Sequence, residues 1–563
     1  MLLKLNPDNE LDAALLAHRP DFVRAAGFSL LSNLLMLVPT LYMLQVYDRV
    51  LTGRSTTTLL MLTLILLVMV ALQTAVDAVR GGVLQRVGVG LDRQLGVRVF
   101  DAVLKRNLRA PEGNPVQSLH DLTTLRQFLG GAGVIVFFDA PWAPIYIGVI
   151  CLIHPWLGLF ALVAALFILA LALLNERLAR APLEEAQKYA LRAASLASGQ
   201  LRNAEAAEAM GMIRGLRARW TALQERVLAL QELASQRASA VGSSTRFVRV
   251  ASQSLVLGLG AWLAIDDLIT PGGMIAASIL LGRGLAPVEQ GIAQWKAWLS
   301  ARSAHGRLYK LLADFPTLPE AMPLPKPSGL ITVENVTAGP PGVKAPVLKD
   351  LAFRINAGDV VGVIGPSASG KSSLARLLVG LWAPTAGSVR MDSVEVSTWD
   401  KSELGPHIGY LPQDVELFEG SVADNIARFG AVVPDMVVAA AQRAGVHEMV
   451  LRLSNGYGTP LGPGGAALSA GQRQRIALAR ALYGEPRIVV LDEPNASLDE
   501  AGELALSMAI QELKSKNATV VLITHRRSVL SAVDKLLCLR DGVVVAYGPR
   551  DAVLQVLQKE SGK

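Results

Sequence analysis

Eight consecutive residues in the second half of the chain have the types and spacing of a phosphate-binding loop. They complete the pattern G-x-x-x-x-G-K-[ST] as Gly365, Pro366, Ser367, Ala368, Ser369, Gly370, Lys371 and Ser372. Glycines let backbone N–H groups approach phosphate oxygens, and a helix that starts here adds favourable partial charge. We expect Lys371 to reach the β- and γ-phosphates, Ser372 to bind Mg²⁺, and Ser373 to belong to the same nucleotide-binding segment.

Two adjacent carboxylates supply a second part of this chemistry. Asp492 and Glu493 follow the apolar run of RIVVLDEP, residues 487–494. Asp492 suits Mg²⁺ coordination, directly or through water, and Glu493 suits a base that orients and polarises an attacking water. Alone, the pair would also fit a solvated acidic turn after a core strand. Beside the glycine loop, phosphate chemistry is the better explanation.

Two further polar residues are candidates for the same site. His525 follows ATVVLIT, and a histidine after a strand is usually structural. Here that strand would end beside the phosphate loop, so we predict that His525 senses the γ-phosphate. Gln413, in YLPQD, lies between two apolar segments and would be unremarkable by itself.

Three short apolar segments must position these side chains. Residues 359–364, 487–491 and 518–524 have the composition of buried strands, and SLARLLVGLW after the loop has a helical pattern. The carboxyl ends of parallel strands meet at one edge of a sheet, where ligands bind in open α/β folds. The second half is therefore predicted to be an α/β domain with one phosphate site at that edge.

The composition of the whole chain excludes an ordinary soluble enzyme. Of 563 residues, 51% are hydrophobic and 18% are charged, whereas soluble domains average about 25% charged residues. Disorder and coiled coil are excluded as well, and the length predicts more than one domain. A net charge of +7 would by itself allow nucleic acid, a membrane surface or acidic ligands. Cys151 and Cys538 have no disulfide or metal spacing.

Apolar runs in the first half predict six membrane spans. A bilayer core of about 30 Å needs roughly 20 apolar helical residues. The uncharged run 140–175 exceeds one span, and His154-Pro155-Trp156 predicts a turn between two. The first run is longer than the apolar region of a signal peptide, so we expect it to be retained. The predicted spans are residues 25–47, 55–76, about 133–153, about 157–175, about 247–265 and about 270–293.

Basic residues indicate how these spans are oriented. Residues 1–325 hold 30 Lys and Arg against 23 Asp and Glu, while residues 326–563 hold 24 of each. Connection 80–126 carries eight basic residues and connection 176–249 carries twelve. Cytoplasmic loops are enriched in Lys and Arg, so we expect these connections, as helical extensions, and both termini in the cytoplasm. The excess positive charge is then explained by the orientation of the chain in a lipid bilayer. No nucleic-acid partner is needed to explain it.

A proline-rich stretch marks the boundary between the two halves. DFPTLPEAMPLPKP has the composition of a semi-rigid linker. We expect a short cytoplasmic N-terminal segment at 1–21, a transmembrane domain at 22–314, the linker at 315–328 and a nucleotide-binding domain at 329–563. Pro111-Glu112-Gly113-Asn114 is expected to break the first long connection.

Further motifs resemble those of the ATP-binding cassette (ABC) family. LSAGQRQR, residues 468–475, is similar to its signature motif, and NASLD, residues 495–499, to its D-loop. YLPQD is similar to the Q-loop and ITHR to the switch-histidine loop. The resemblance implies that ATP and Mg²⁺ are bound and that the enzyme is an ATP hydrolase.

The resemblance also implies roles for individual residues. Gln413 would sense Mg²⁺ and couple to the membrane helices, and Ser469 and Gly471 would grip the γ-phosphate of a nucleotide on another cassette. The predicted catalytic residues are Glu493, His525, Lys371 and Gln413. Beyond the glycine loop, the predicted nucleotide contacts are Gln413, Ser469, Gly471, Gln472, Asp492 and Asp499. The predicted Mg²⁺ ligands are Ser372, Gln413 and Asp492.

The order of the two halves resembles an ABC exporter half-transporter. The implied fold is an α-helical six-span transmembrane exporter domain fused to an α/β P-loop ABC nucleotide-binding domain. LYMLQVYDRVL, FFDAPWAPIY and LLGRGLAPVEQ are similar to segments of type I secretion ATPases of the protease- and lipase-exporting (PrtD-type) kind. Because the chain has one glycine loop and one signature motif, the resemblance implies a homodimer with two composite ATP sites.

Relatives of this kind export unfolded polypeptides that carry an uncleaved C-terminal signal. The resemblance therefore implies a bacterial inner-membrane location, a periplasmic membrane-fusion adaptor and an outer-membrane channel as partners. The segment before the first span has about 20 residues, which leaves no room for the peptidase domain of some exporters. Substrates with cleaved double-glycine leaders are therefore not expected.

The chain departs from the family pattern at two places. Ala470 replaces the first glycine of the signature pair, and alanine is the smallest replacement. The segment VENVTAGPPG has no aromatic residue to stack on adenine. Aliphatic, proline or more distant contacts would then hold the base.

Other functions and other uses of the ionisable span residues stay open at this point. A lipid or drug exporter of the same architecture is the main alternative to protein export. A non-transporting ATPase conflicts with six spans, and a nucleotide-regulated receptor or channel conflicts with the presence of Glu493 and His525. Asp139, Arg283 and Glu289 lie in predicted spans, where they would either line a translocation path or pair between helices.

Overall fold

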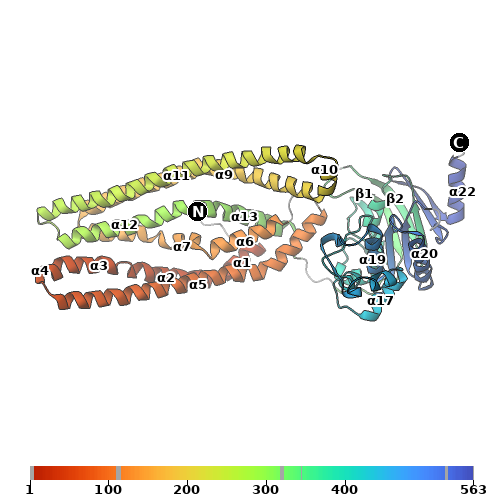
Figure 1. The fold of residues 1–563 in the computed structure, drawn as a ribbon, viewed down its shortest axis with the longest axis horizontal. Coiled ribbons are helices and arrows are strands. Elements are labelled where there is room, and N and C mark those ends of the chain that lie inside the picture. Colours follow the sequence, from red (N-terminus) through yellow and green to blue (C-terminus); the bar gives the residue numbers. More distant parts are fainter. Residues whose placement is uncertain (1–5, 110–115, 318–321, 344, 527–529, 562–563) are drawn as a thin grey trace. The chain divides into compact units, whose positions relative to one another are not determined.

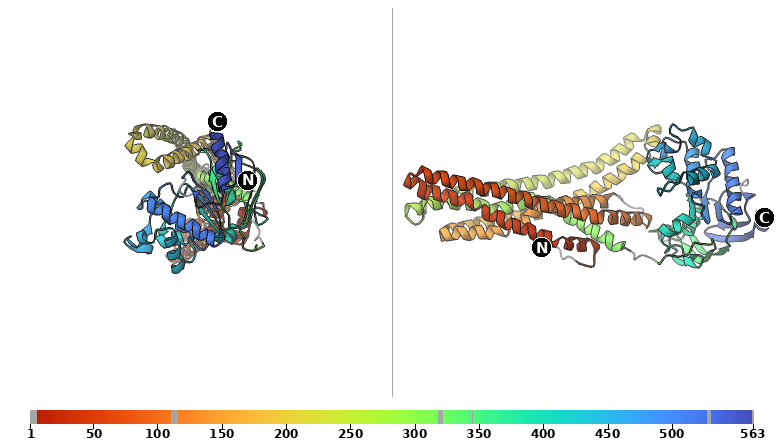
Figure 2. Two further views of the ribbon diagram at one scale, coloured as in Figure 1. Left: turned by 90° about the vertical axis from the view of Figure 1, so that its right-hand side faces the viewer. Right: turned by 90° about the horizontal axis from the view of Figure 1, so that it is seen from below.

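The computed structural model describes residues 6–109, 116–317, 322–343, 345–526 and 530–561. The chain divides near Thr317 into two compact units, one helical and one of mixed α/β structure (Figures 1 and 2). The predicted break at 111–114 and part of the predicted linker, 318–321, lie outside the described residues.

The helical unit contains helices that are long and apolar enough to cross a membrane. In the described chain five helices meet both conditions, and the pair α7 and α8, bent by 41°, makes a sixth if it is one span. The described helices thus give five or six spans, against the six that were predicted. The spans are Arg19–Gly53 (α2 Arg19–Leu35, α3 Val38–Gln45, α4 Leu51–Gly53), α5 Thr56–Arg109, α7 Ala132–Asp139 with α8 Trp142–Ile153, α9 Pro155–Arg202, α11 Ile213–Ile265 and α12 Pro271–Ala293.

Three of these helices extend far beyond their apolar part. α5 has 54 residues, α9 has 48 and α11 has 53. At about 1.5 Å per residue, each is more than twice as long as a bilayer core of about 30 Å. α9 and α11 run side by side (Figures 1 and 2). The prediction that the spans continue as helices into the long connections is confirmed. Shorter helices complete the unit: α1 Glu10–Ala17, α6 Gln117–Leu129, α10 Ala204–Ala209 and α13 Trp295–Asp314.

The predicted turn at His154 separates α8 from α9. His154 has extended backbone, and its Nδ1 accepts a hydrogen bond from the Trp156 N–H at 3.3 Å. Pro155 occupies the first helical position, where its missing N–H costs nothing. Thr270 and Pro271 start α12 in the same way. A capping side chain followed by proline therefore sets both helix starts.

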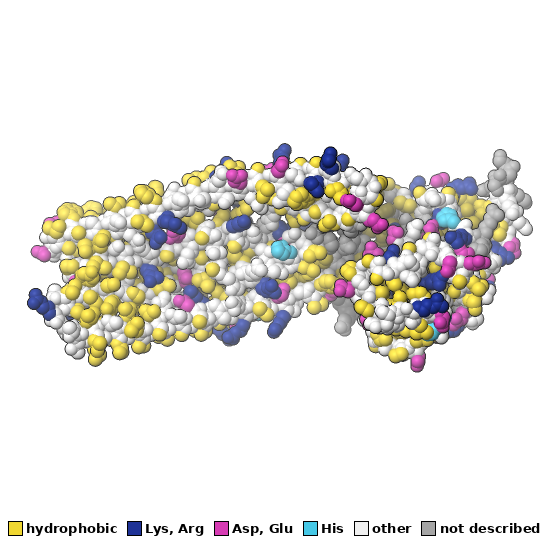
Figure 3. Space-filling model, viewed as in Figure 1, with side chains coloured by type: hydrophobic (Ala, Val, Ile, Leu, Met, Phe, Trp, Pro, Cys, Tyr) yellow, Lys and Arg dark blue, Asp and Glu magenta, His cyan; other side chains and the backbone are white. Residues whose placement is uncertain are grey.

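Large apolar side chains lie exposed on the helical unit. Leu60 and Leu67 of α5 and Leu152 of α8 are 64%, 64% and 87% exposed. Figure 3 shows hydrophobic side chains over much of the helical unit. Such a surface is costly in water and suits a lipid environment. The unit is that of a multi-pass membrane protein.

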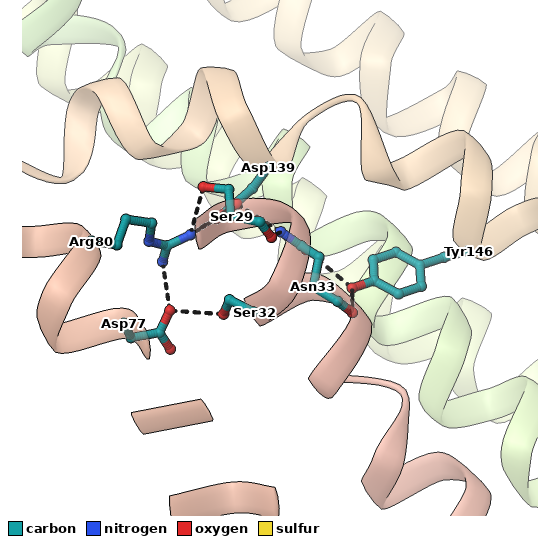
Figure 4. A network of polar contacts seen from close by, with 7 residues as sticks. All are labelled: Ser29, Ser32, Asn33, Asp77, Arg80, Asp139 and Tyr146. Atoms are coloured by element: carbon teal, nitrogen blue, oxygen red, sulfur yellow. Dashed lines mark hydrogen bonds and ion pairs between the residues drawn. The ribbon is translucent and has the colours of Figure 1, made fainter. Parts of the chain in front are cut away.

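A buried polar network joins α2, α5 and α7 (Figure 4). The Arg80 guanidinium lies 3.1 Å from Asp139 Oδ1 and 3.0 Å from Asp77 Oδ1, and it donates a 3.0 Å hydrogen bond to Ser29 Oγ. Ser32 Oγ donates to Asp77 at 2.7 Å. Of the two uses predicted for Asp139, pairing between helices is the one that the structure contains.

The same network continues to α8. Asn33 Nδ2 donates to Asp139 Oδ1 at 2.8 Å, and the Tyr146 hydroxyl donates to both the carbonyl and the Oδ1 of Asn33, at 3.0 Å each. Asp139 and Tyr146 flank the bend between α7 and α8, so the network anchors both arms of that bend to α2. Of the other ionisable span residues, Glu289 pairs with Arg249 at 3.0 Å and Arg283 is exposed.

The second unit is built on a six-stranded sheet. Its strand order is β12-β11-β3-β10-β9-β6, with β12 antiparallel and the other neighbours parallel. A four-stranded antiparallel sheet has the order β2-β1-β4-β5, and β7 pairs with β8. The strands are β1 Ile331–Ala338, β2 Leu348–Ile355, β3 Val360–Ile364, β4 Ala386–Met391, β5 Val394–Glu395, β6 Ile408–Leu411, β7 Gly420–Ser421, β8 Pro460–Leu461, β9 Ile488–Asp492, β10 Thr519–Ile523, β11 Lys535–Arg540 and β12 Val543–Pro549.

Both faces of the six-stranded sheet are buried. Val489 and Val520 pack into one hydrophobic core with helices that include α19 and α20, while Val490 and Val521 pack into a second core with α14, β1 and β2. This explains why β9 and β10 are continuous apolar runs. The helices are α14 Lys371–Leu378, α15 Lys401–Leu404, α16 Val422–Ile426, α17 Pro434–Arg443, α18 His447–Leu451, α19 Ala470–Leu482, α20 Glu500–Ser515 and α22 Arg550–Ser561.

Candidate nucleotide-binding and hydrolysis site

The glycine loop joins the end of β3 to the start of α14. Gly365 and Gly370 have φ values of 156° and 98°. A Cβ at Gly365 would lie 2.1 Å from the carbonyl oxygen of Leu539, and one at Gly370 would lie 2.5 Å from the side chain of Leu348. Both positions therefore require glycine. α14 begins directly at Lys371, so its first N–H groups belong to the loop.

Lys371 folds back across this loop. Its Nζ donates hydrogen bonds to the carbonyl oxygens of Gly365, at 3.0 Å, and Pro366, at 2.8 Å. Burial lowers the pKa of Lys371, while the carboxylates of Glu493 and Asp492 oppose that shift. Ser369 is only 2% exposed, and its Oγ has no hydrogen-bond partner among the described residues. The Lys371 ammonium group in the loop and the unpartnered Ser369 hydroxyl are both suited to binding phosphate oxygens.

Parallel strand pairing brings the carboxylates to the loop. β10 lies between β3 and β9, and Ile523 is in register with both Val363 and Asp492. The predicted meeting of three strand ends at one edge is confirmed. Asp492 is 2% exposed, its Oδ1 has no partner among the described residues, and burial raises the pKa of this carboxyl. A buried carboxylate oxygen without a partner fits a divalent cation such as Mg²⁺.

Four predicted site residues form a chain of polar contacts. Ser372 Oγ donates to Gln413 Oε1 at 3.4 Å, and Gln413 Nε2 donates to Glu493 Oε2 at 3.4 Å. His525 Nε2 lies 3.6 Å from Glu493 Oε1. The four side chains come from α14, the segment after β6, the end of β9 and the end of β10. The structure thus brings together a predicted Mg²⁺ ligand, the predicted base and the predicted phosphate sensor.

The signature residues form a second cluster at the start of α19. Ser469 Oγ accepts from the Gln472 N–H at 3.3 Å, and Gln472 Oε1 accepts from the Ser469 N–H at 2.9 Å, which is a capping box. Gly471 packs against the Ser497 carbonyl, since a Cβ there would lie 2.7 Å from it. Ala470 is exposed at the first position of the helix, and the helix itself does not crowd its methyl group.

Asp499 belongs to the same region of the domain. Its Oδ1 accepts from the Gly502 N–H at 2.8 Å, which caps α20, and it pairs with Arg475 of α19. These bonds hold the pKa of Asp499 below its ordinary value, with the Gly502 N–H as the largest cause. Within one copy, Asp499 is thus a cap and a link between helices. Its predicted contact to nucleotide stays a prediction.

Gln474 is a site residue that the sequence did not single out. It is 5% exposed on α19, and its Nε2 donates to the carbonyl oxygens of Glu493, at 3.0 Å, and Pro494, at 2.7 Å. Its Oε1 accepts from the Ser497 N–H at 2.8 Å. A glutamine on the apolar face of an amphipathic helix was the available signal. Gln474 ties the signature helix to the backbone of the predicted base.

Comparisons with known proteins place both units in one family. Residues 25–284 match the model of the ABC transporter transmembrane region, and residues 348–496 match that of the ABC transporter. The chain is 43% identical over 551 residues to the type I secretion system ATP-binding protein PrsD of Rhizobium meliloti, which covers 97% of this chain and 95% of that protein.

Two more distant proteins agree with this result. The toxin RTX-I translocation ATP-binding protein of Actinobacillus pleuropneumoniae is 28% identical over 96% of this chain and 77% of its own length. A bacterial Atm1-family ABC exporter with ATP bound has the same fold, with a TM-score of 0.80 and 22% identity over 96% of each chain. The chain therefore belongs to the ABC transporters, and it is an ATPase-coupled transporter with a transmembrane region followed by an ATP-binding domain.

Proposed function

We propose that the chain is the ABC transporter of a type I secretion system, which uses ATP hydrolysis to export an unfolded polypeptide across the bacterial inner membrane. The observation that supports this substrate class is the 43% identity to a type I secretion ATP-binding protein over nearly the whole of both chains. The Atm1-family exporter shares less than a quarter of its residues with this chain and supports the fold alone.

The residues at the edge of the six-stranded sheet suggest how hydrolysis proceeds. Lys371 and the loop N–H groups hold the β- and γ-phosphates. Glu493 accepts the proton of the attacking water. His525, whose Nε2 lies 3.6 Å from Glu493 Oε1, contacts the γ-phosphate. Mg²⁺, held by Ser372, Gln413 and Asp492, would supply neutralisation of the phosphate charge.

The working unit in this proposal is a homodimer. The chain contains one glycine loop and one signature segment, and within one copy Ser469 and Gln472 bond to each other. Ser469 and Gly471 of one copy would complete the phosphate site of the other. ATP then shifts the equilibrium between open and closed nucleotide-binding domains toward the closed dimer. It can do so only to the extent that it binds the closed state more tightly than the open state.

Orientation and partners complete the proposal. Both termini and the long helical extensions lie in the cytoplasm, as the basic residues indicate. A periplasmic adaptor and an outer-membrane channel would carry the polypeptide onward, and its C-terminal signal would be recognised without cleavage.

Transport assays in inverted membrane vesicles test the substrate class. We expect ATP-dependent uptake of an unfolded polypeptide that carries the C-terminal region of a protein encoded near this chain's gene. Uptake should be absent with Lys371→Ala, because the phosphates lose their cation. ATP-dependent movement of a fluorescent lipid or a drug, with no uptake of polypeptide, would show that the chain is instead a lipid or drug exporter.

A further inference from the structure

The ring of His525, the proposed γ-phosphate contact, is held by little of its own surface. The side chain is 47% exposed, and its Nε2 lies 3.6 Å from Glu493 Oε1, which is longer than a hydrogen bond. A group that acts on a reacting phosphate needs a fixed position, because a displacement of about 1 Å can cost about 100-fold in rate. The backbone on either side of His525 therefore has to provide that position.

Thr524 fixes the backbone on both sides of His525. It directly follows β10 and is fully buried. Its N–H donates to the Val363 carbonyl at 3.4 Å, and its Oγ1 accepts from the Arg526 N–H at 3.1 Å. The second bond closes a tight turn around His525, of the kind that threonine hydroxyls form with the N–H two residues on. The hydroxyl of Thr524 thus shapes the turn that carries the histidine.

A hydrogen bond joins this turn to the segment of the proposed base. The Thr524 hydroxyl donates to Oδ1 of Asn495 at 3.2 Å. Asn495 is 4% exposed and lies two residues after Glu493. The Glu493 N–H donates to the Ile523 carbonyl at 3.0 Å, and the side-chain bond continues this link beyond the ends of the two strands. The base and the histidine are therefore connected by one backbone and one side-chain hydrogen bond.

Stability alone does not explain an asparagine at position 495. The Nδ2 of Asn495 is buried and has no hydrogen-bond partner in the part of the chain that the structure describes. A buried N–H without a partner is destabilising, and an apolar side chain of similar size would avoid this effect. An apolar side chain could not accept from Thr524, however. What the asparagine supplies here is the bond to the histidine turn.

We propose that Thr524 and Asn495 are positioning residues for His525, and that their hydrogen bond holds the histidine against the γ-phosphate beside Glu493. The inference rests on the proposed function and deepens it, because it names the residues that place the γ-phosphate contact. The glycine loop binds the nucleotide, so loss of this hydrogen bond should slow hydrolysis and leave ATP binding intact.

ATPase kinetics of the full-length transporter in lipid nanodiscs test this proposal. Thr524→Val keeps the shape of the side chain and removes its hydroxyl. The segment should stay folded, because Arg526 also pairs with Glu503 of α20. We expect kcat to fall about tenfold and KM to change less than about twofold. Asn495→Leu removes the acceptor and should have the same effect, whereas Thr524→Ser keeps the hydroxyl and should keep most of the activity.

Thr519→Val is the matched control for the loss of a buried hydroxyl. Thr519 begins β10, at the opposite end from Thr524, and is also fully buried. Its hydroxyl donates to the Gly329 carbonyl at 2.8 Å and accepts from the Gly358 N–H at 3.0 Å. Thr519→Val should lower the Tm about as much as Thr524→Val and leave kcat unchanged. An equal fall of kcat in the two variants, or unchanged kcat in both Thr524→Val and Asn495→Leu, would overturn the proposal.

A double-mutant cycle tests whether Thr524 acts through His525. Single-turnover hydrolysis, followed for hours, gives rates for slow variants. In the His525→Ala transporter, Thr524→Val should slow hydrolysis less than about twofold further. A further loss as large as that in the unaltered chain would overturn the proposal, because Thr524 would then act on another group.

Two other results concern the proposed function. Normal hydrolysis by His525→Ala would overturn the role of His525 and this inference with it. The hydrolysis assays contain no polypeptide, so a failure of the export proposal would be seen only as absent polypeptide uptake in inverted vesicles. The two failures can therefore be told apart.

Discussion

Glu493 has an unusual backbone conformation for the base that it is proposed to be. Its φ is 50°, in the left-handed region that non-glycine residues rarely adopt, and its N–H donates to the Ile523 carbonyl at 3.0 Å. Its own carbonyl accepts from Gln474 at 3.0 Å. Contacts on both sides of the residue therefore keep it in a conformation that it would otherwise leave. We therefore expect Gln474 to act as a positioning residue for the proposed base.

Replacement of Gln474 should slow hydrolysis more than it weakens nucleotide binding. Gln474→Ala leaves two carbonyl oxygens and one N–H without their partner, at a cost of about 1–3 kcal/mol for each buried group. We expect kcat of ATP hydrolysis to fall about tenfold while KM changes less than about twofold. Steady-state ATPase kinetics of the purified transporter measure both constants.

Two variants separate positioning from a general loss of stability. Gln474→Glu keeps an acceptor for the Ser497 N–H and loses both donors, so it should behave like Gln474→Ala. Gln442→Ala, at an exposed position of α17, should change neither constant. An unchanged kcat in Gln474→Ala would show that the base is held without it.

The residue types and their order predicted most of the phosphate site. The glycine loop, Asp492, Glu493 and His525 follow apolar strands, and parallel strands bring such ends together. Gln474 could not be predicted in the same way, because its partners are backbone atoms of a segment about 20 residues away in the chain. A side chain that bonds backbone leaves no complementary residue type in the sequence to reveal it.

The bend between α7 and α8 shows how elements of the membrane unit are held together. α7 ends at Asp139 and α8 begins at Trp142, and the network of Arg80, Asn33 and Tyr146 secures both sides of this break. Arg80 is 7% exposed between two carboxylates. Its removal would leave Asp77 and Asp139 with uncompensated charge.

Arg80→Ala should therefore destabilise the helical unit strongly. Breaking a buried ion pair from one side costs about 3–5 kcal/mol, so we expect a clear fall of the Tm in detergent or nanodiscs. Asp139→Asn should be milder, since an amide oxygen can still accept from Arg80. Arg86→Ala, an exposed arginine six positions along the same helix, is the matched control. Equal Tm values for Arg80→Ala and Arg86→Ala would contradict a stabilising role of the network.

The lengths of the apolar runs predicted the six spans, but the interruptions within two of these spans were not predicted. The first span contains a π-helical turn at Val46–Val50, and the third is bent after Asp139. The π-helical turn is held by contacts with the start of α12, because Asp48 accepts hydrogen bonds from Thr270 Oγ1 and the Gly272 N–H. The bend falls at Pro141, a helix-breaking residue that the sequence contains. The three buried strands were likewise predictable, but the position of β10 between β3 and β9 follows from pairing over more than 150 residues of chain.

The proposed homodimer leads to a prediction that concerns the whole molecule. If each ATP site takes its loop from one copy and its signature from the other, Lys371→Ala and Ser469→Arg should each inactivate their own homodimer. A mixed dimer of the two variants would contain one fully intact site, so about half of the normal ATPase activity should return, as two-fold symmetry requires.

Two differently tagged copies, purified together, allow this measurement. An inactive mixed dimer would contradict the composite site, because loop and signature would then act within one chain. A dimer of unaltered chains with the same two tags controls for the tags and for the purification.

In the proposed mechanism, polypeptide movement requires ATP hydrolysis at Glu493, and this coupling can be measured. Phosphate release and uptake of an unfolded polypeptide are measured in the same inverted vesicles, for the unaltered chain and for Glu493→Gln. Glutamine cannot take up the proton of the attacking water, so we expect retained ATP binding with loss of both phosphate release and uptake. Continued ATP-dependent uptake by Glu493→Gln, at the rate of the unaltered chain, would contradict the proposed coupling of hydrolysis to export.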